Sequence, residues 1–291
     1  MTAKPVVAAA DGSEESLRAV EWAAGEAVLR GASLRIVAAA SPPPRMFNLL
    51  ARPDRDVIAD LTREELGQAL AAAAARAAAV SSGLQADTVP LAGPPTQAVT
   101  ESGSGASMLV VGAHGTGALG SVALGSVSWH AAAYASCPVV VVRGETAAVH
   151  REIGIGIGDL DTCADSLTFA FEEASLRKAS LVAVHAWHTP LAAISRAGSS
   201  PPVPGLDSTA AEAARQLAGL LDDWQKKYPG VPVSQYVVRD RPSWVLVGLS
   251  VRADLVVIGR HASRSGLPGP GSVRHAVLNR ALGSVAVVPS S

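Results

Sequence analysis

The chain has 291 residues, of which 48% are hydrophobic and 17% charged, so it can bury the core of one large domain or of two ordinary ones. Its net charge of −1 and the lack of a basic run argue against nucleic-acid partners. No apolar run approaches the roughly 18 residues that a membrane-spanning helix needs, so no membrane association is expected. Because there are only two cysteines and no signal-peptide pattern, we expect a cytoplasmic protein without a disulfide framework.

Short apolar runs alternate with longer helical patterns along the first half of the chain. In chain order they predict strand 5–10, helix 14–30, strand 33–39, helix 54–82, strand 86–91, helix 95–104, strand 107–112, helix 126–136 and strand 138–143. Mostly apolar strands that alternate with helices are typical of a parallel sheet covered on both faces. At the start of the first helix, Ser13 can cap toward Ser16. The pattern therefore predicts an α/β fold.

The second half of the chain repeats the first at a constant offset. Val6–Ala10 returns as Ile153–Ile157, an offset of 147 (153 − 6), and Pro95 also recurs 147 residues later. A constant offset over the length of a domain indicates a tandem duplication. We therefore predict two domains, residues 1–146 and residues 147–291.

A glycine-rich loop follows the fourth predicted strand. Its spacing is Gly112-x2-Gly115-x9-Gly125-Ser126, which is neither a Walker A loop nor a GxGxxG motif. A strand, a glycine loop and a helix N-terminus together are typical of phosphate sites, because glycines let the backbone approach an anion and the first helical N–H groups point at it. The alternative is an ordinary turn in a glycine-rich α/β protein.

Three motifs, in this order, resemble those of the universal stress proteins. They are Asp11-Gly12-Ser13 after the first strand, Gly93-Pro94-Pro95 after the third, and the glycine loop. Because both halves share the resemblance, the chain is similar to tandem universal stress proteins of the actinobacterial type. The resemblance implies two doubly wound five-stranded parallel sheets of strand order 3-2-1-4-5, packed as a pseudo-dimer. It also implies ATP binding and a role in stress or dormancy physiology, without an established catalytic reaction.

The pseudo-dimer has a physical counterpart in the sequence. The apolar runs 139–142 and 285–288 are both expected at sheet edges, and an uncovered apolar edge invites pairing. We expect the two strands to meet across an internal pseudo-twofold axis. Assembly of two chains into a homodimer is expected by analogy only, and the sequence does not name a protein partner.

The expected strand order places the ligand site between strands one and four, where the order reverses. Asp11 ends strand one and Gly112 ends strand four, so their motifs converge there. Between Gly112 and Ser128 there is no Lys or Arg. A triphosphate would therefore be held by backbone dipoles and a metal ion such as Mg²⁺, with no side-chain cation in the loop, and we expect modest affinity.

Each part of the nucleotide has an expected set of contacts. The N–H groups of 112–118 would wrap the phosphates, and Ser126 and Ser128 would add hydroxyl donors. Asp11 would accept a hydrogen bond from a ribose hydroxyl or from water on Mg²⁺. The alternative is that Asp11 only belongs to the turn that precedes the first helix. The predicted nucleotide-binding residues, including a floor of two apolar side chains, are Ala9, Asp11, Val37, Gly112, Ala113, His114, Gly115, Thr116, Gly117, Ala118, Gly125, Ser126, Val127 and Ser128.

No catalytic or metal-ligating residue is predicted. His114 in the loop suggests a base or a metal ligand, but a loop histidine is more often merely solvated. The seven histidines show no metal-ligand spacing with cysteines or carboxylates. Cys137 precedes a proline at a helix end, and we expect it to pack rather than to sense redox changes.

The function expected from these observations is that of a cytoplasmic ATP-binding universal stress protein. Nucleotide binding would change a conformation or an assembly, without enzymatic turnover. One alternative is an ATP-hydrolysing or nucleotidyl-transferring enzyme. Measurable turnover of ATP that is abolished by Asp11→Ala would favour this alternative. A ligand-free interaction module is the other, and failure to bind any adenine nucleotide would favour it. The sequence leaves the physiological nucleotide and the inducing stress open.

The second domain carries a degenerate copy of the motif. Proline lacks a backbone N–H donor, and the loop of the second copy contains two prolines. We therefore expect one ATP per chain, bound by the first domain. Three motif residues are retained in the second domain and several arginines occur there, so weak binding by that domain stays open. The changed positions are Gly158, Asp240, Ala262, Pro268, Pro270 and Arg274, and the retained ones are Gly259, Gly271 and Ser272.

Overall fold

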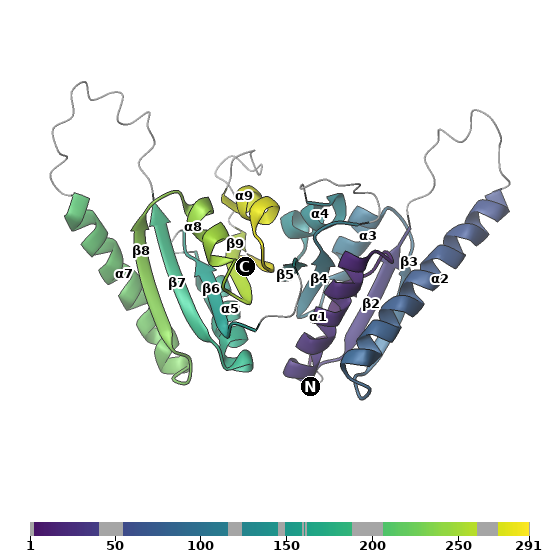
Figure 1. Cartoon of the computed structure of the whole chain (residues 1–291), viewed down its shortest axis with the longest axis horizontal. Helices are drawn as coiled ribbons and strands as arrows, with labels where there is room; N and C mark the ends of the chain where they lie inside the picture. The colour runs from purple at the N-terminus through teal and green to yellow at the C-terminus, as the bar shows by residue number, and fades with distance from the viewer. Residues whose placement is uncertain are drawn as a thin grey trace, which may run out of the picture. The chain divides into compact units, whose positions relative to one another are not determined.

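The chain folds into two compact units, Met1–Thr146 and Ala147–Ser291 (Figure 1). The computed structural model describes residues 3–40, 55–115, 124–144, 149–158, 160, 162–187, 206–260 and 273–290, with the side chains of 55–59 and 206–209 left out. The expectation that strands 139–142 and 285–288 meet stays a prediction.

The first unit is a parallel α/β sheet of strand order β3-β2-β1-β4-β5, as predicted. In Figure 1, α1 and α2 pack together on one face of this sheet, and α3 and α4 pack together on the other. This is the arrangement that right-handed crossovers produce. The elements are β1 (Val6–Ala9), α1 (Glu14–Arg30), β2 (Leu34–Ala39), α2 (Arg55–Val80), β3 (Ala86–Leu91), α3 (Pro95–Ser102), β4 (Met108–Gly112), α4 (Ser126–Tyr134) and β5 (Val139–Val142).

Strands of this sheet are apolar where helices cover both faces. All residues of β1, β4 and β5 are buried, whereas the edge strand β3 is mostly exposed. At the start of α1 the predicted cap is confirmed, since the Ser13 side chain accepts a hydrogen bond from Ser16 N at 3.2 Å. The helix ends at Gly31, whose φ of 59° is the left-handed conformation that glycine adopts readily. These local signals define where α1 begins and ends.

Helix α2 is joined to α1 by apolar contacts and by charge. Leu70, Ala73 and Ala77 are buried. Arg76 of α2 reaches back to α1, where its Nη1 lies 2.5 Å from Glu21 Oε1 and its Nη2 lies 3.0 Å from Glu14 Oε1. The alanine-rich run is therefore an ordinary packed helix. Its contacts with α1 set its position relative to the end of β1.

The second unit repeats the same topology, with the parallel order β8-β7-β6-β9-β10. The pairing register is repeated too, because the Ala9–Val37 pair of β1 and β2 returns as Gly156–Val184 of β6 and β7. The elements are β6 (Glu152–Gly156), α5 (Ala164–Arg177), β7 (Ser180–Trp187), α7 (Leu206–Lys227), β8 (Val233–Arg239), α8 (Pro242–Leu249), β9 (Leu255–Arg260), α9 (Val273–Arg280) and β10 (Val285–Pro289).

A buried ion pair confirms the duplication at the level of single side chains. Glu26 in α1 is buried and paired with Arg30 on the next turn. In α5, Glu173 is fully buried and lies 3.0 Å from Arg177. A buried charge is tolerated only where it is paired, so the same buried pair in each half is a specific mark of common origin.

Candidate functional site

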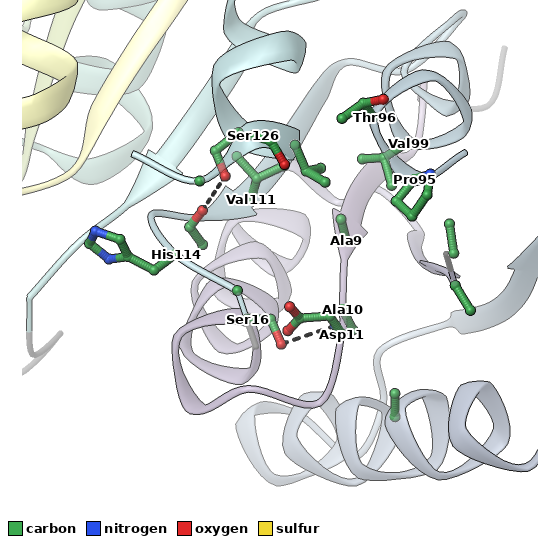
Figure 2. Close-up of a pocket in the computed structure, with 18 of the residues that line it drawn as sticks. Ala9, Ala10, Asp11, Ser16, Pro95, Thr96, Val99, Val111, His114 and Ser126 are labelled. Carbon is green, nitrogen blue, oxygen red and sulfur yellow. Dashed lines mark hydrogen bonds between the residues drawn. The ribbon is translucent and has the colours of Figure 1, made fainter. Parts of the chain in front are cut away.

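A cavity of about 750 Å³ opens at the carboxyl ends of the strands of the first unit. It lies where the strand order reverses, which is the expected ligand position in a doubly wound sheet. Its walls come from the ends of β1, β2 and β4, the start of α1, the side of α2, the β3–α3 connection and the start of α4. Figure 2 shows Pro95, Thr96 and Val99 on one side of Ala9 and His114 on the other.

Asp11 is held in the turn between β1 and α1. Its Oδ1 accepts hydrogen bonds from Ser13 N at 3.0 Å and from Ser13 Oγ at 2.6 Å. The Asp11 backbone N–H donates to Ser16 Oγ at 3.2 Å, drawn as a dashed line in Figure 2. The side chain is exposed and lines the cavity. The turn role and the ligand role are therefore compatible, because Oδ1 serves the turn while the carboxylate still borders the cavity.

Two loop glycines are required by the approach of this turn. A Cβ on Gly112 would lie 2.9 Å from the carbonyl carbon and oxygen of Glu15, so no larger residue fits there. A Cβ on Gly115 would collide with Oδ2 of Asp11. The motif after β1 and the loop after β4 thus converge, as the strand order predicts, with Gly112 against the backbone of Glu15 and Gly115 against the Asp11 carboxylate.

Gly125 closes the loop and precedes α4. Its N–H donates to the carbonyl oxygen of Ala113 at 2.9 Å, which fastens the end of the loop to its beginning. A Cβ here would lie 3.4 Å from the same oxygen, and the backbone φ of −63° is one that any residue adopts. A Cβ alone is therefore in ordinary van der Waals contact, and only a larger or branched side chain would extend into the loop or the cavity.

The N-terminus of α4 faces the cavity. Gly125, Ser126, Val127 and Ser128 all line it. Trp129 N donates to Gly125 O at 2.9 Å, which is the first hydrogen bond of the helix. The N–H groups of residues 126–128 precede that bond and have no acceptor within the helix. They are the kind of group that binds an anion at a helix N-terminus.

The role expected for Ser128 needs correction. Its Oγ donates to the carbonyl oxygen of Gly112 at 2.6 Å, and the residue is only 5% exposed. A hydroxyl has one proton to donate, so this side chain holds α4 against the end of β4 and has no proton left for a ligand. Ser126 is exposed at the first position of α4, where its hydroxyl borders the cavity.

The remaining predicted residues divide into three groups. Ala9 lines the cavity floor, but Val37 is completely buried in β2 and lies outside the lining, where Ala39 and Ala40 replace it. Ala113 is buried and also lies outside the lining, although its carbonyl oxygen fixes the loop. The loop residues that fall outside the described part of the chain are Thr116, Gly117 and Ala118.

His114 lines the cavity, but Figure 2 shows its ring turned away from Ala9 and Asp11. Its Nε2 is buried and has no hydrogen-bond partner among the residues that the structure describes. The ring is therefore poorly placed to act as a base on a ligand next to Asp11.

The sequence motifs do not indicate the wall that α2 contributes. Glu65, Leu66 and Ala69 line the cavity from this helix, and a Cβ on Gly12 would lie 3.6 Å from that of Ala69. Positions 65, 66 and 69 share one face of a helix, but nothing in the sequence tells which face of α2 turns toward the end of β1. In the β3–α3 connection, by contrast, Pro95 belongs to a motif visible in the sequence.

The cavity is acidic in its described part. Asp11 and Glu65 contribute carboxylates, and no Lys or Arg belongs to the lining formed by the described residues. Within the same part of the chain, no three His, Cys, Asp or Glu side chains gather as metal ligands. A divalent cation here would therefore need ligand oxygens, from phosphate or water, in addition to those of the protein.

The second unit has a smaller cavity at the equivalent place. Its described lining encloses about 200 Å³ and includes Gly158 where the first unit has Asp11, and Arg274 where it has Ser128. Leu246 replaces Val99, and a Cβ on Gly156 would lie 2.7 Å from Leu246 Cδ1. Helix α8 thus packs directly onto β6. The loop residues Asp159, Ala262, Pro268, Pro270, Gly271 and Ser272 lie outside the described residues.

The chain is similar to known proteins over its whole length. The profile of the universal stress protein family matches residues 2–143 and 150–289. A universal stress protein of Mycobacterium tuberculosis is 35% identical, with 98% of this chain and 97% of the relative covered. One from Mycolicibacterium smegmatis is 33% identical, with 97% and 96% covered. The crystal structure of a universal stress protein from Archaeoglobus fulgidus has the same fold, with a TM-score of 0.71 at 16% identity and both chains fully covered.

Among the helices that the structure describes, none has the length and apolar character needed to cross a membrane.

Proposed function

The chain belongs to the universal stress protein family, and from that premise we propose that its first unit binds an adenine nucleotide, ATP accompanied by Mg²⁺. The protein would act in the stress response, in the cytoplasm. Nucleotide binding would change its conformation or its assembly, and the nucleotide would not be turned over. The second unit would serve the fold and the assembly, so that one nucleotide is bound per chain.

The start of α4 is the observation that carries this proposal. The N–H groups of residues 126–128 line a cavity at the point of strand reversal, and the glycines of the loop bring backbone close to the same space. A helix N-terminus offers aligned donors and the positive end of the helix dipole, which together favour phosphate oxygens. The Ser128–Gly112 hydrogen bond keeps this helix end in position before a ligand arrives.

The size and lining of the cavity support a nucleotide rather than inorganic phosphate alone. Its volume of about 750 Å³ falls within the range of about 300–1,000 Å³ typical of small-molecule sites. Pro95 and Val99 offer apolar surface for a base on the side away from His114, and Leu66 adds to the apolar lining. Asp11 lies between that surface and the loop, where it could accept from a ribose hydroxyl.

The charge of the cavity supports Mg²⁺ as part of the ligand. Two carboxylates and no described cation line the cavity, so the phosphate charge must be offset by the helix dipole and by a metal ion. When bound, Mg²⁺ would supply positive charge beside the phosphates, and Asp11 would be the residue to hold it through water.

The side chains that line the cavity favour binding of a nucleotide without its turnover. Phosphoryl transfer needs cationic groups at the transferring oxygens as well as an acid or base near the reacting atoms, and of the titratable groups in the lining Asp11 is engaged in the β1–α1 turn. The ring of His114 is turned away from Asp11, and the described lining contains no Lys or Arg to stabilise transferring phosphoryl oxygens. A ligand in this cavity would instead join the β1–α1 turn, α2 and α4, and so couple occupancy to the arrangement of these three segments.

One experiment tests the proposal directly. The intact protein is purified without added nucleotide and denatured, and any released compound is identified by mass. The emptied and refolded protein is then titrated calorimetrically with ATP in excess Mg²⁺. We expect an adenine nucleotide in the extract and a stoichiometry of one in the titration. If neither step detects an adenine nucleotide, the ligand-free interaction module becomes the better description.

A further inference from the structure

Strand β8 is the outermost strand of the second unit (Figure 1). It pairs with β7 on one side, and on its other side no strand lies among the residues that the structure describes. Ser234, Gln235 and Tyr236 are exposed, Tyr236 by 49%. An open strand edge presents N–H and C=O groups that another strand can join, and native proteins commonly block such an edge with a charge or a proline.

The matching edge of the first unit carries both of these blocks. β3 and β8 occupy equivalent places and pair in the same register with their neighbours. At an offset of 147 residues (237 − 90), the exposed Asp87 of β3 corresponds to Ser234 of β8, and the exposed Pro90 corresponds to Val237. The edge of the second unit therefore lacks the charge and the proline that its counterpart has.

The direction of the backbone groups shows that the proline stands on the open side. Leu34 N donates to Gln85 O at 2.9 Å, and the equivalent Leu181 N donates to Pro232 O at 2.8 Å. Backbone groups alternate between the two sides of a strand, so the groups one, three and five positions after these carbonyls face outward. The outer row of donors is therefore interrupted at Pro90 in β3. In β8 the outward positions are 233, 235, 237 and 239, and each keeps its N–H.

The outer edge of β8 is complementary to a second copy of itself. The strand runs from Val233 to Arg239, so its midpoint is Tyr236. A twofold axis at this midpoint would align two antiparallel strands over their full length, with position 235 opposite 237 and position 233 opposite 239. Each outward position would then meet an outward position of the other copy, and the two Tyr236 side chains would form a close cross-strand aromatic pair.

The charges of the strand are compatible with the same arrangement. Between positions 233 and 238 the strand has no charged residue, and Arg239 and Asp240 follow at its end. In an antiparallel pair these two charged residues of one copy would lie opposite Pro232 and Val233 of the other, which are uncharged. Like charges would therefore not face each other across the axis, whereas directly opposed like charges destabilise a strand pair.

We propose that β8 is a docking edge for a second copy of this chain, which joins it as an antiparallel strand about a twofold axis at Tyr236. The self-complementary register favours a second copy over an extended peptide of another protein, because a twofold interface uses the same surface of both partners. Two seven-residue strands make a small interface, so the dimer is weak and dissociates on dilution. The inference does not depend on the nucleotide site.

Sedimentation velocity of the full-length protein, without nucleotide and between about 1 and 100 µM, tests this. We expect the parent to be dimeric at the upper end of this range. Val237→Pro should raise the dissociation constant of the dimer by at least about tenfold, because each chain loses one outward donor. The fold should accept this proline, since Pro90 occupies the equivalent position of β3. Val237→Thr keeps the N–H and a β-branched side chain, and as the matched control it should follow the parent.

Disulfide trapping tests the register, and it also decides the question if Val237→Pro does not fold. Opposed residues of a non-hydrogen-bonded antiparallel pair have Cα atoms about 4.5 Å apart, which is within the range of a disulfide. Tyr236→Cys should therefore link two chains when oxidised glutathione is added. Val89→Cys alters the equivalent, partly exposed position of β3 and should stay unlinked, because Pro90 blocks that edge. Both native cysteines, Cys137 and Cys163, are buried.

Three results would overturn the proposal. If the parent stays monomeric at about 100 µM, the edge does not join a second copy, and an extended peptide becomes the better candidate. If folded Val237→Pro dimerises like the parent, the two chains meet at another surface. Equal linking of Tyr236→Cys and Val89→Cys would indicate random collision. None of these results affects the nucleotide site proposed for the first unit, which titration with ATP tests separately.

Discussion

The hydroxyl of Ser128 donates a hydrogen bond to the carbonyl oxygen of Gly112 at 2.6 Å, in a buried position. This bond joins the first turn of α4 to the last residue of β4, the two elements that flank the glycine loop. The helix N-terminus that faces the cavity is therefore held by a side chain of its own first turn. The accuracy with which its N–H groups point at a ligand depends on this contact.

Replacement of Ser128 by alanine should lower both stability and nucleotide affinity. It leaves the buried carbonyl of Gly112 without its donor, which costs about 1–3 kcal/mol of unfolding free energy. We expect the affinity for ATP in Mg²⁺ to fall as the start of α4 loosens. Urea unfolding and calorimetry measure the two effects. Ser126→Ala, at an exposed position of the same turn, is the control for stability and should stay within about 0.5 kcal/mol of the parent. Equal stability of the two variants would show that the bond contributes nothing.

Gly125→Val should remove ATP binding and keep the fold. The backbone φ of −63° suits valine, but the Cβ would lie 3.4 Å from Ala113 O and 3.6 Å from His114 Cα, so the added methyl groups must enter the loop or the cavity. We expect at least about a tenfold loss of affinity, which corresponds to about 1.4 kcal/mol. Gly83→Val is the control, since nothing lies within 4 Å of a Cβ there. Parent-like affinity of Gly125→Val would mean that the ligand binds elsewhere.

The two units should differ in nucleotide binding. Gly125→Val and Gly271→Val alter matched positions in full-length chains. Calorimetry should find one ATP bound by the parent and by Gly271→Val, and none by Gly125→Val. The physical reason is that the cavity of the second unit is smaller and apolar, because the Leu246 side chain packs against Gly156 there. Loss of binding in Gly271→Val alone would place the site in the second unit.

The Arg76 contacts should govern local opening of α2. The hydrogen bond to Glu21, followed by that to Glu14, raises the pKa of Arg76. The stabilisation from this shift is present below the unfolded-state pKa and lost only as pH rises through the still higher folded value. Between pH 5 and 9, roughly, the contacts should therefore show no pH dependence from the guanidinium.

Amide hydrogen exchange can measure the contribution of these contacts. Arg76→Met should speed exchange in α2 near Ala69 by about twofold to fivefold, because both inter-helix ion pairs are lost at a partly exposed site. The control is Arg63→Met, whose partner Asp60 lies within the same helix. Unchanged exchange in Arg76→Met, or equal effects in the two variants, would leave apolar packing as the sole anchor of α2.

The amino-acid sequence by itself determined the elements, their order and the duplication. Strand runs such as Val139–Val142 are apolar throughout because both faces of the sheet are covered, and such a run is visible without any coordinates. The 147-residue offset predicts that Ala9 and Gly156 occupy equivalent places, and the repeated strand register confirms it. The glycine motif located the loop for a related reason, because Gly112 stands where the backbone of Glu15 approaches too closely for any side chain, and Gly115 stands against the Asp11 carboxylate.

Only the tertiary structure decided what the side chains around the loop do. Ser128 reads as a ligand donor in the motif, but its proton goes to a carbonyl 16 residues earlier in the chain. Val37 was expected in the cavity floor, yet packing buries it completely. Glu65 enters the lining because Arg76 and Ala69 set the orientation of α2 against α1 and Gly12. A sequence pattern gives the period of a helix or strand, whereas the partner of a side chain depends on how elements far apart in the chain pack together.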